Sequence, residues 1–228
     1  MTSPSGIPKK NARRKAHHTM AAERKTPLDF TNMYATHDAF RRDLDRLVTA
    51  VEEGRAGSAG VRAGWENFKK QLHLHHTVED AELWPRVKRA VTGRPKDLAL
   101  MAEMEAEHAE LDPRLDAVDD ALARGRADGL AELVGALSTV LRDHMEHEEK
   151  SALPLIQEVL TAKDWDAFRG GMARAQGPRG AAVYVPWVCD GAPDEDRDRF
   201  LAGMPAPVRM LNRAFWTAGY RKKGFWKG

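Results

Sequence analysis

The sequence predicts an all-α protein: an up-down four-helix bundle built from a duplicated helical hairpin and followed by a C-terminal helical extension. Apolar residues recur at steps of three and four along four long segments, which is the pattern of amphipathic helices. Short segments that contain glycine separate them, as in antiparallel bundles. Sequence motifs of the first two segments return in the last two, which indicates the duplication.

The four helices are expected within a bundle domain at residues 28–160. They cover about residues 30–53, 61–91, 96–124 and 129–160. Pro113 lies inside the third segment. It predicts a kink or a break there, because proline lacks the N–H that a helix interior uses.

The N-terminal residues 1–27 are polar and basic, with little apolar surface to bury. This composition predicts a disordered tail. A solvated tail is preferred to a nucleic-acid-binding or lipid-binding arm, because basic runs are weak motifs. Met20 is an alternative start to Met1.

Residues 161–228 form the predicted C-terminal extension. Its glycines and prolines at 170–180 predict a loop, and YVPWVCDGAP at 184–193 predicts an extended segment with a turn. Two short helices are expected at about 194–203 and 207–220. We expect the extension to cover an apolar patch of the bundle or of a partner subunit. Contact with a membrane surface is the alternative, because basic residues flank its apolar side chains Val208, Leu211 and Phe215.

Composition limits the classes of protein. The 228 residues, 42% of them hydrophobic, suffice for one well-filled core. No apolar run reaches the ~18 residues of a membrane span, and the basic N-terminus lacks the apolar core of a secretion signal. The single cysteine, Cys189, cannot form an internal disulfide, which fits a reducing cytoplasm. A net charge of +2 predicts no nucleic-acid partner. We therefore expect a cytoplasmic monomer or homodimer.

Polar residues interrupt each of the four apolar stripes. Every stripe contains a histidine, and on the second and fourth a glutamate follows it by one helical turn. Burying such residues is costly unless they are paired or bound to something. A single histidine on a stripe is usually a hydrogen-bonded core residue, but one on each of four helices indicates a shared ligand.

The internal repeat selects the histidines that face inward. HDAFRRDLDRL aligns with HAELDPRLDAV 71 residues later, and HHTVEDAELWP aligns with HMEHEEKSALP 69 residues later. Each half supplies one His on its first helix and His-x-x-x-Glu on its second. The predicted metal ligands are His37, His75, Glu79, His108, His144 and Glu148. The repeat selects His75 over His76, and it leaves His73, His76 and His147 outside the site.

Residues four apart lie on one face of a helix, so each pair presents an imidazole and a carboxylate to the same point. This donor set suits iron, manganese or zinc rather than calcium, which prefers oxygen ligands. Because a carboxylate can bridge two metals, six ligands with twofold symmetry predict a dinuclear site with one bridging glutamate from each half. A ferritin-like site is rejected, because it needs two Glu-x-x-His motifs and only one occurs.

These motifs resemble the hemerythrin-like, cation-binding HHE domains over about residues 28–160. MYATHDAFRRDLDRL and YVPWVCDGAP also resemble hemerythrin-like proteins of actinobacteria. The resemblance implies a four-helix bundle with two iron ions, bridged by two carboxylates and by an oxo or hydroxo group. Manganese and zinc are the alternatives to iron. The ligand roles would fall on the six residues named above.

The chain departs from the oxygen-carrying hemerythrins at two points. Their third helix has a second histidine where this chain has Asp112, and their fourth helix has its acid five residues after the histidine, whereas Glu148 follows His144 by four. The loss of one imidazole ligand predicts two irons with more open coordination positions. It argues against simple reversible oxygen carriage. Tyr34, one turn before His37, is a candidate neighbour of the site, and a core tyrosine with a satisfied hydroxyl is the alternative.

Three functional classes follow. The first is a redox protein that disproportionates hydrogen peroxide or activates oxygen, since some hemerythrin-like proteins with this ligand set show catalase-like activity. The second binds or senses oxygen, nitric oxide or iron without turnover. The third, a structural metal site, is disfavoured because such sites are usually closed zinc tetrahedra. The expected partner is therefore a diatomic molecule or a peroxide.

Overall fold

The computed structural model describes residues 27–125 and 128–227. Within these ranges every regular element is a helix, so the predicted all-α class is confirmed. The predicted disorder of the N-terminal tail concerns residues that, apart from Pro27, lie outside the described part of the chain.

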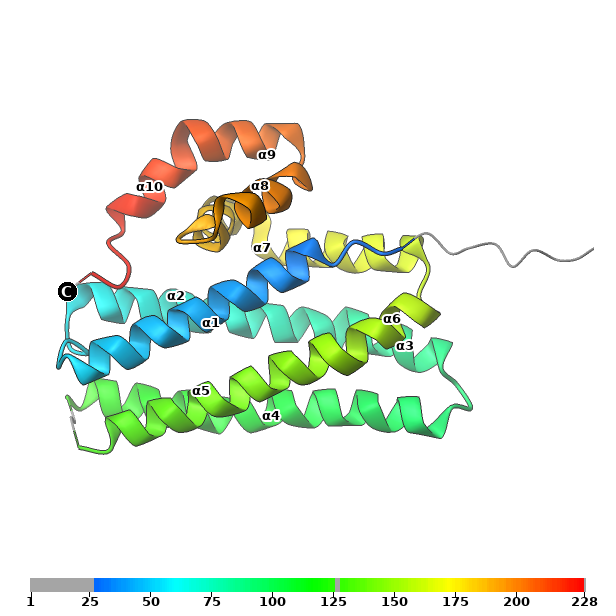
Figure 1. Cartoon of the computed structure of the whole chain (residues 1–228), viewed down its shortest axis with the longest axis horizontal. Coiled ribbons are helices and arrows are strands. Elements are labelled where there is room, and N and C mark those ends of the chain that lie inside the picture. The colour runs from blue at the N-terminus through cyan, green and yellow to red at the C-terminus, as the bar shows by residue number, and fades with distance from the viewer. Residues whose placement is uncertain (1–26, 126–127, 228) are drawn as a thin grey trace, which may run out of the picture.

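Four helical rods run side by side and form the bundle (Figure 1). The second and fourth rods each consist of two α-helices joined by a π-helical turn. The elements are α1 (Thr31–Glu52), α2 (Ala59–Val78), η1 (Glu79–Leu83), α3 (Trp84–Ala90), α4 (Pro95–Ala123), α5 (Leu130–His147), η2 (Glu148–Ala152) and α6 (Leu153–Val159). The predicted kink or break at Pro113 does not interrupt α4, which is continuous through that residue.

Local sequence signals set the connections between the rods. The Ser58 side chain accepts a hydrogen bond from the Val61 N–H and caps α2, as serine commonly does at a helix start. Gly93 has φ +85° between α3 and α4, a conformation that favours glycine. Pro95 then occupies the first turn of α4, where a missing N–H costs nothing.

The core has two apolar halves with a polar layer between them. One half contains Phe40, Leu72, Leu111 and Leu141. The other half contains Met33, Leu83, Met104 and Ala152. The predicted ligands lie between these positions along every rod. Packing on both sides therefore fixes the height at which the polar side chains meet.

The turn predicted within residues 184–193 forms at Asp190 and Gly191, but the predictions of a loop at 170–180 and of an extended segment from 184 were wrong. Neither a loop nor an extended segment forms there, because α7 spans Ala162–Cys189. Its one non-helical residue is Gly177, at φ 59° and ψ 176°, where the helix bends. Gly171 lacks a side chain for a different reason: a Cβ there would lie 2.6 Å from the Glu82 carboxylate. That glycine allows close packing of α7 on η1 and does not mark a loop.

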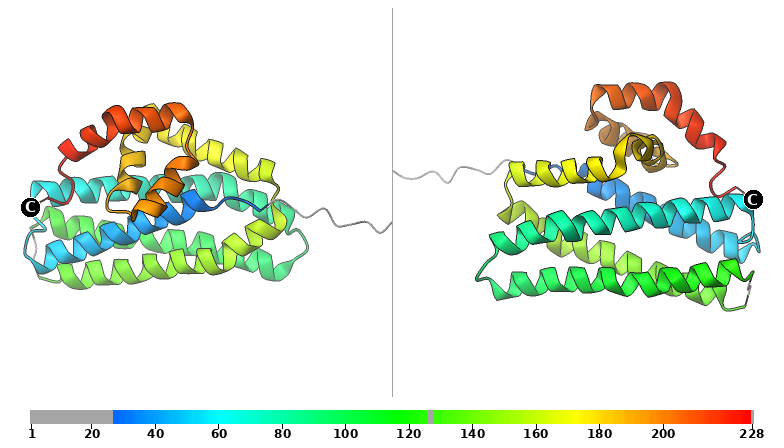
Figure 2. Two further views of the ribbon diagram at one scale, coloured as in Figure 1. Left: turned by 45° about the horizontal axis from the view of Figure 1, so that its top comes forward. Right: turned by 180° about the vertical axis from the view of Figure 1, so that it is seen from behind.

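The extension continues through α8 (Asp194–Ala202), α9 (Ala206–Leu211), η3 (Asn212–Trp216) and α10 (Thr217–Lys222). Seen from two further sides, α7 and the following helices lie over α1 and α2, on one face of the bundle (Figure 2). The chain end returns to the start of α2, where the Trp226 N–H donates to the Gly60 carbonyl over 2.7 Å. Of the described helices, none has the length and apolar character to cross a membrane.

A buried polar network attaches α7 to α1. Asp43 is fully buried and accepts hydrogen bonds from the Trp187 indole N–H at 2.8 Å and from Arg42 Nε at 2.9 Å. Arg42 also donates to the Trp187 and Asp190 carbonyls. These hydrogen bonds hold α7 against α1. Farther along, Met210, Leu211 and Phe215 remain exposed, and membrane contact stays the untested alternative.

Candidate metal centre

All six predicted ligands meet in the polar layer of the bundle. Each is buried, with at most 5% of its surface exposed. They come from α1, α2, η1, α4, α5 and η2: His37, His75, Glu79, His108, His144 and Glu148, respectively.

Both glutamates occupy the first position of a π-helical turn. The N–H groups of Trp84 and Leu153 bond to the carbonyls of Glu79 and Glu148, five residues back. A proline follows each turn, at Pro85 and Pro154. Proline has no N–H to continue the i to i−4 pattern, so the preceding turn can widen. Such single wide turns often occur at functional sites.

One cluster forms where α1, α2 and η2 approach one another. The His37 Nε2 atom lies 3.1 Å from Glu148 Oε2 and 3.3 Å from His75 Nε2. These three side chains have the proximity that a metal ion requires. Two imidazole nitrogens and one carboxylate oxygen thus face a common point.

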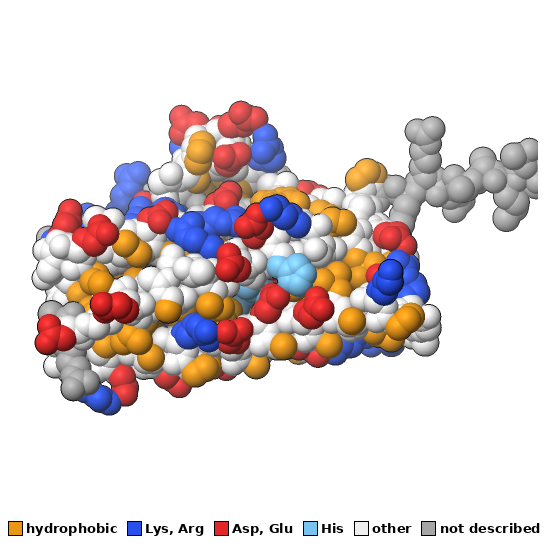
Figure 3. All heavy atoms as spheres, turned by 60° about the horizontal axis from the view of Figure 1, so that its bottom comes forward, with side chains coloured by type: hydrophobic (Ala, Val, Ile, Leu, Met, Phe, Trp, Pro, Cys, Tyr) orange, Lys and Arg blue, Asp and Glu red, His pale blue; other side chains and the backbone are white. Residues whose placement is uncertain are grey.

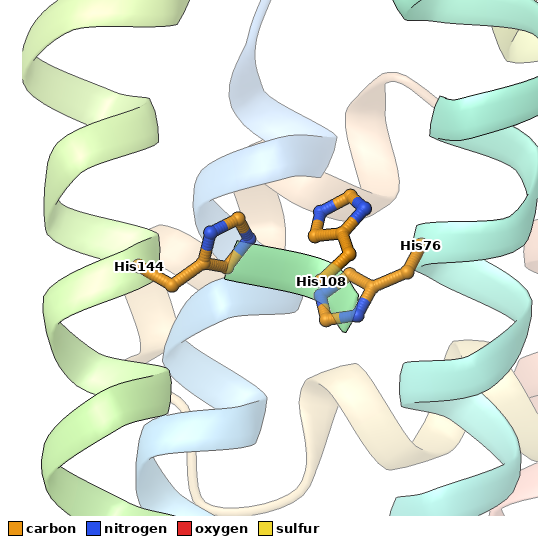
Figure 4. A group of neighbouring side chains, drawn as sticks. All are labelled: His76, His108 and His144. Carbon is orange, nitrogen blue, oxygen red and sulfur yellow. The ribbon is translucent and has the colours of Figure 1, made fainter. Parts of the chain in front are cut away.

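A second cluster contains a histidine that the sequence reasoning left outside the site. His76, His108 and His144 bring ring nitrogens within 4.8 Å of one another. Figure 4 shows the three rings extending from α2, α4 and α5 into the same interior space. The His76 ring stacks on His108 with 3.9 Å between centroids and 12° between planes. The interpretation of His76 as a flanking residue was therefore wrong.

Glu79 lies between the two clusters. Its Oε1 atom is 3.2 Å from His75 Nε2, and its Oε2 atom is 3.7 Å from His108 Nε2. One carboxylate therefore has an oxygen facing each side. This is the arrangement that a bridging ligand needs.

The buried polar atoms without hydrogen bonds are concentrated here. They include both carboxylate oxygens of Glu79 and of Glu148, and ring nitrogens of His75, His108 and His144. The short His37–Glu148 approach lacks the angles of a hydrogen bond, so both Glu148 oxygens remain unsatisfied. An unsatisfied buried polar group costs about 1–3 kcal/mol. A bound cation would offset that cost at several atoms at once.

Outer carboxylates orient three of the rings. Glu149 holds His37 at Nδ1, Asp80 holds His108, and Glu107 holds His144, each over 2.8 Å. A carboxylate at the far nitrogen fixes the ring and raises its basicity as a ligand. The other nitrogen, Nε2, is then left to face the interior. The sequence does carry a signal for two of these acids, because an acidic residue directly follows both ligand glutamates.

These outer contacts cross between the two halves of the chain. Asp80 follows Glu79 in the first half and bonds His108 in the second. Glu149 follows Glu148 in the second half and bonds His37 in the first. The reciprocal pattern fits the pseudo-twofold symmetry that the repeat predicts.

His75 is the exception to this pattern. Its Nδ1 atom has no hydrogen-bond partner in the described part of the chain. The position equivalent to Glu107, directly before the single histidine, is Thr36. The Thr36 hydroxyl bonds instead to the Asn32 carbonyl and to the Tyr184 hydroxyl, each at 2.7 Å. The two halves of the site are therefore not equivalent.

Burial and charge shift the acid–base equilibria of the cluster. Burial, together with the Glu148 charge, raises the pKa of Glu79 well above its usual range. Although burial alone opposes it, the Glu148 and Glu149 carboxylates raise the pKa of His37 to about 9. Burial raises the pKa of Glu148, but the nearby histidines His37, His75 and His144 together outweigh burial and lower this pKa to about 2. The first cluster thus favours a positive charge beside Glu148.

At the surface, the rim of the second cluster is acidic. His147 is partly exposed and bonds to Glu107 at 2.7 Å, with Glu103 at 3.9 Å. Figure 3 shows a histidine side chain reaching the surface of this side among acidic side chains. His147 lies outside the ligand set, as the repeat predicted.

Two further residues that the sequence analysis named, Tyr34 and Asp112, do not join the cluster. Tyr34 is 43% exposed, and the described residues offer its hydroxyl no hydrogen bond. The interpretation of Tyr34 as a core residue with a satisfied hydroxyl was therefore wrong. Burial raises the pKa of Tyr34, and the charges of Glu149 and Glu148 raise it further. Asp112 is exposed on α4. The third rod therefore supplies one imidazole to the site, that of His108. The fifth imidazole comes from His76 on α2 instead.

Comparison with known proteins yields one family. The family model described as the hemerythrin HHE cation binding domain matches residues 28–156, which is more than half of the chain. No curated protein and no solved structure matches the chain significantly.

Proposed function

Because the chain belongs to the hemerythrin HHE cation-binding family, we propose that it is a non-haem di-iron protein that reacts with hydrogen peroxide or activates oxygen. The concentration of unsatisfied buried carboxylate and imidazole atoms in two facing clusters carries this proposal. Imidazole and carboxylate ligands suit iron. When bound, two irons would supply electron transfer to and from a small oxygen species.

The residues divide into three groups. His37, His75 and Glu148 would hold one ion, and His76, His108 and His144 would hold the other. Glu79 has one oxygen on each side and would bridge them. The outer acids Asp80, Glu107 and Glu149 keep the ring nitrogens directed inward.

The protein environment restricts the substrate. The six predicted ligands are buried, and apolar clusters lie on both sides of them. This burial favours a small molecule such as peroxide or oxygen at the centre itself.

The second candidate is binding or sensing of oxygen, nitric oxide or iron without turnover. The observation that favours it is that each outer acid already bonds to an imidazole. These acids are therefore not free to transfer protons to a bound molecule. A redox enzyme commonly uses an additional proton donor or acceptor near the reacting atoms.

The test is metal content and turnover of the full chain. Protein loaded with ferrous iron under argon is analysed for metal, exposed to air and then mixed with peroxide. We expect iron in both clusters and evolution of oxygen from peroxide. Glu79→Gln should lose iron and turnover, whereas Glu146→Gln, which changes a side chain 55% exposed on α5, should keep both. Bound iron without oxygen evolution would favour the second candidate. Zinc alone, or no metal after loading, would refute the di-iron proposal.

A further inference from the structure

A cavity of about 440 Å³ lies between the bundle and the extension. This volume falls within the ~300–1,000 Å³ of small-molecule sites. Most of its wall is apolar and comes from the extension, including Trp165, Phe168, Val185, Met204 and Val208. The bundle supplies Met33 and Thr36 from α1 and His75 from α2.

The cavity exists because α7 bends. Gly177 takes φ 59° and ψ 176°, and Pro178 begins the second arm of the helix. The first arm supplies Trp165 and Phe168 to the wall, and the second supplies Tyr184 and Val185. A straight helix of this length could not place both pairs around one space. The family match ends at residue 156, so most of this wall lies outside the matched domain.

The cavity adjoins the candidate metal centre. His75 belongs to both, and its Nδ1 atom has no hydrogen-bond partner among the described residues. Beside it, the Thr36 and Tyr184 hydroxyls bond to each other at 2.7 Å. A molecule in the cavity would therefore contact a ligand side chain of the first cluster.

The polar atoms of the wall restrict the chemistry of a ligand. The Gln176 amide donates to Gln71 Oε1 at 2.6 Å, but its own Oε1 is buried and unsatisfied. Asp166 and Arg169 bond to each other at 3.5 Å. The wall thus offers a large apolar surface and the Gln176 amide, whose buried oxygen has no hydrogen-bond partner among the described residues.

We propose that this cavity binds a small apolar organic molecule that carries one hydroxyl donor, such as an alkylphenol or a medium-chain alcohol. Apolar surface supplies the affinity, and a hydrogen bond to Gln176 orients the molecule. Binding rests on the cavity alone. An influence of the bound molecule on the metal, through His75, rests in addition on the proposed function.

The first experiment measures binding of 4-propylphenol to the full chain by titration calorimetry, with and without iron. We expect one site per chain in both forms. Ala181→Trp and Val208→Trp place an indole at two different points of the wall, and each should weaken binding at least tenfold. Ala136→Trp, at an exposed position on α5, should leave binding unchanged. No binding by the folded wild type up to millimolar probe, or equal binding by both filled variants, would overturn the proposal.

The second experiment distinguishes this proposal from the proposed function. The probe should change the visible absorption of the iron-loaded protein, and this change should disappear in Ala181→Trp. Propylbenzene lacks the hydroxyl and should bind several-fold more weakly to the wild type, but equally to Gln176→Leu. Probe binding by a chain that takes up no iron would uphold the cavity and refute the di-iron centre. Binding without any spectral change would overturn the link through His75.

Discussion

Replacing Glu79 by methionine should stabilise the metal-free protein and destabilise the metal-loaded protein relative to the wild type. Both Glu79 carboxyl oxygens are buried without hydrogen bonds. Leaving such a group unsatisfied costs about 1–3 kcal/mol, and methionine fills a similar volume without that cost. Metal-free Glu79→Met should therefore exceed the metal-free wild type by about 1–3 kcal/mol in the free energy of unfolding.

Iron should reverse this order. A ligand that binds only the folded state stabilises it by about 4.1 kcal/mol at a thousandfold excess over its Kd. The wild type gains this energy, and Glu79→Met, which lacks the residue between the two clusters, should gain much less. The two unfolding curves should then exchange places when chelator is replaced by ferrous iron.

The assay is urea unfolding followed by circular dichroism, once with chelator and once with ferrous iron under argon. The matched control is Glu146→Met, which changes an exposed carboxylate on α5. It should alter stability by no more than about 0.5 kcal/mol and should keep the full effect of iron. If Glu79→Met were less stable than the wild type with chelator, Glu79 would stabilise the fold itself, and the reasoning from unsatisfied atoms would be refuted.

Four further changes test other parts of the structure. Asp43→Ala removes the buried carboxylate that joins Arg42 and Trp187, so it should cost about 3–5 kcal/mol in urea unfolding; Asp45→Ala, whose side chain is 72% exposed, should cost at most about 1 kcal/mol. Glu149→Gln weakens the orientation of His37 and should lower iron affinity about 10–100-fold in a chelator competition; unchanged affinity would contradict that role. His76→Ala should empty the second cluster selectively, so iron content should fall by about half, whereas His73→Ala, at an exposed position, should retain all of it. Burial raises the pKa of Cys189 to about 11, so the reactive thiolate is lost as the pH falls below that value. At pH 8 the thiol should therefore be alkylated roughly a hundredfold more slowly than a thiol of pKa about 9. An alkylation rate like that of free cysteine would refute this raised pKa.

The bundle and the convergence of the six candidate ligands in its interior could be predicted because they follow from periodicity. Helical stripes and a repeat determine which side chains share a face, and an internal symmetry removes the ambiguity of neighbouring histidines. The same symmetry also caused the error at His76. Its counterpart in the second half is Met145, so the repeat excluded it. Consecutive residues lie about 100° apart on a helix, and both His75 and His76 border the interior.

The extension was harder to predict because local composition and tertiary packing disagree there. Glycines and prolines at 170–180 indicate a loop by their propensities. In the structure Gly171 allows the Glu82 carboxylate to approach the α7 backbone closely. Gly177 makes a single bend, and Pro178 begins the second helical arm of α7. The outer carboxylates were also missed, since surface acids on helices are common and only the fold shows that Asp80 and Glu149 reach across to the other half.

The two π-helical turns bear on the history of the chain. They occupy Glu79–Leu83 and Glu148–Ala152, which are equivalent positions of the two halves, and each begins at a glutamate of the site. Each turn holds one residue more than an α-helical turn would, so each records an insertion relative to a regular helix. Two separate insertions at equivalent positions after a duplication require more events than one insertion before it. The simplest history is a single ancestral hairpin that already carried the widened turn and paired with a second copy of itself before the genes fused.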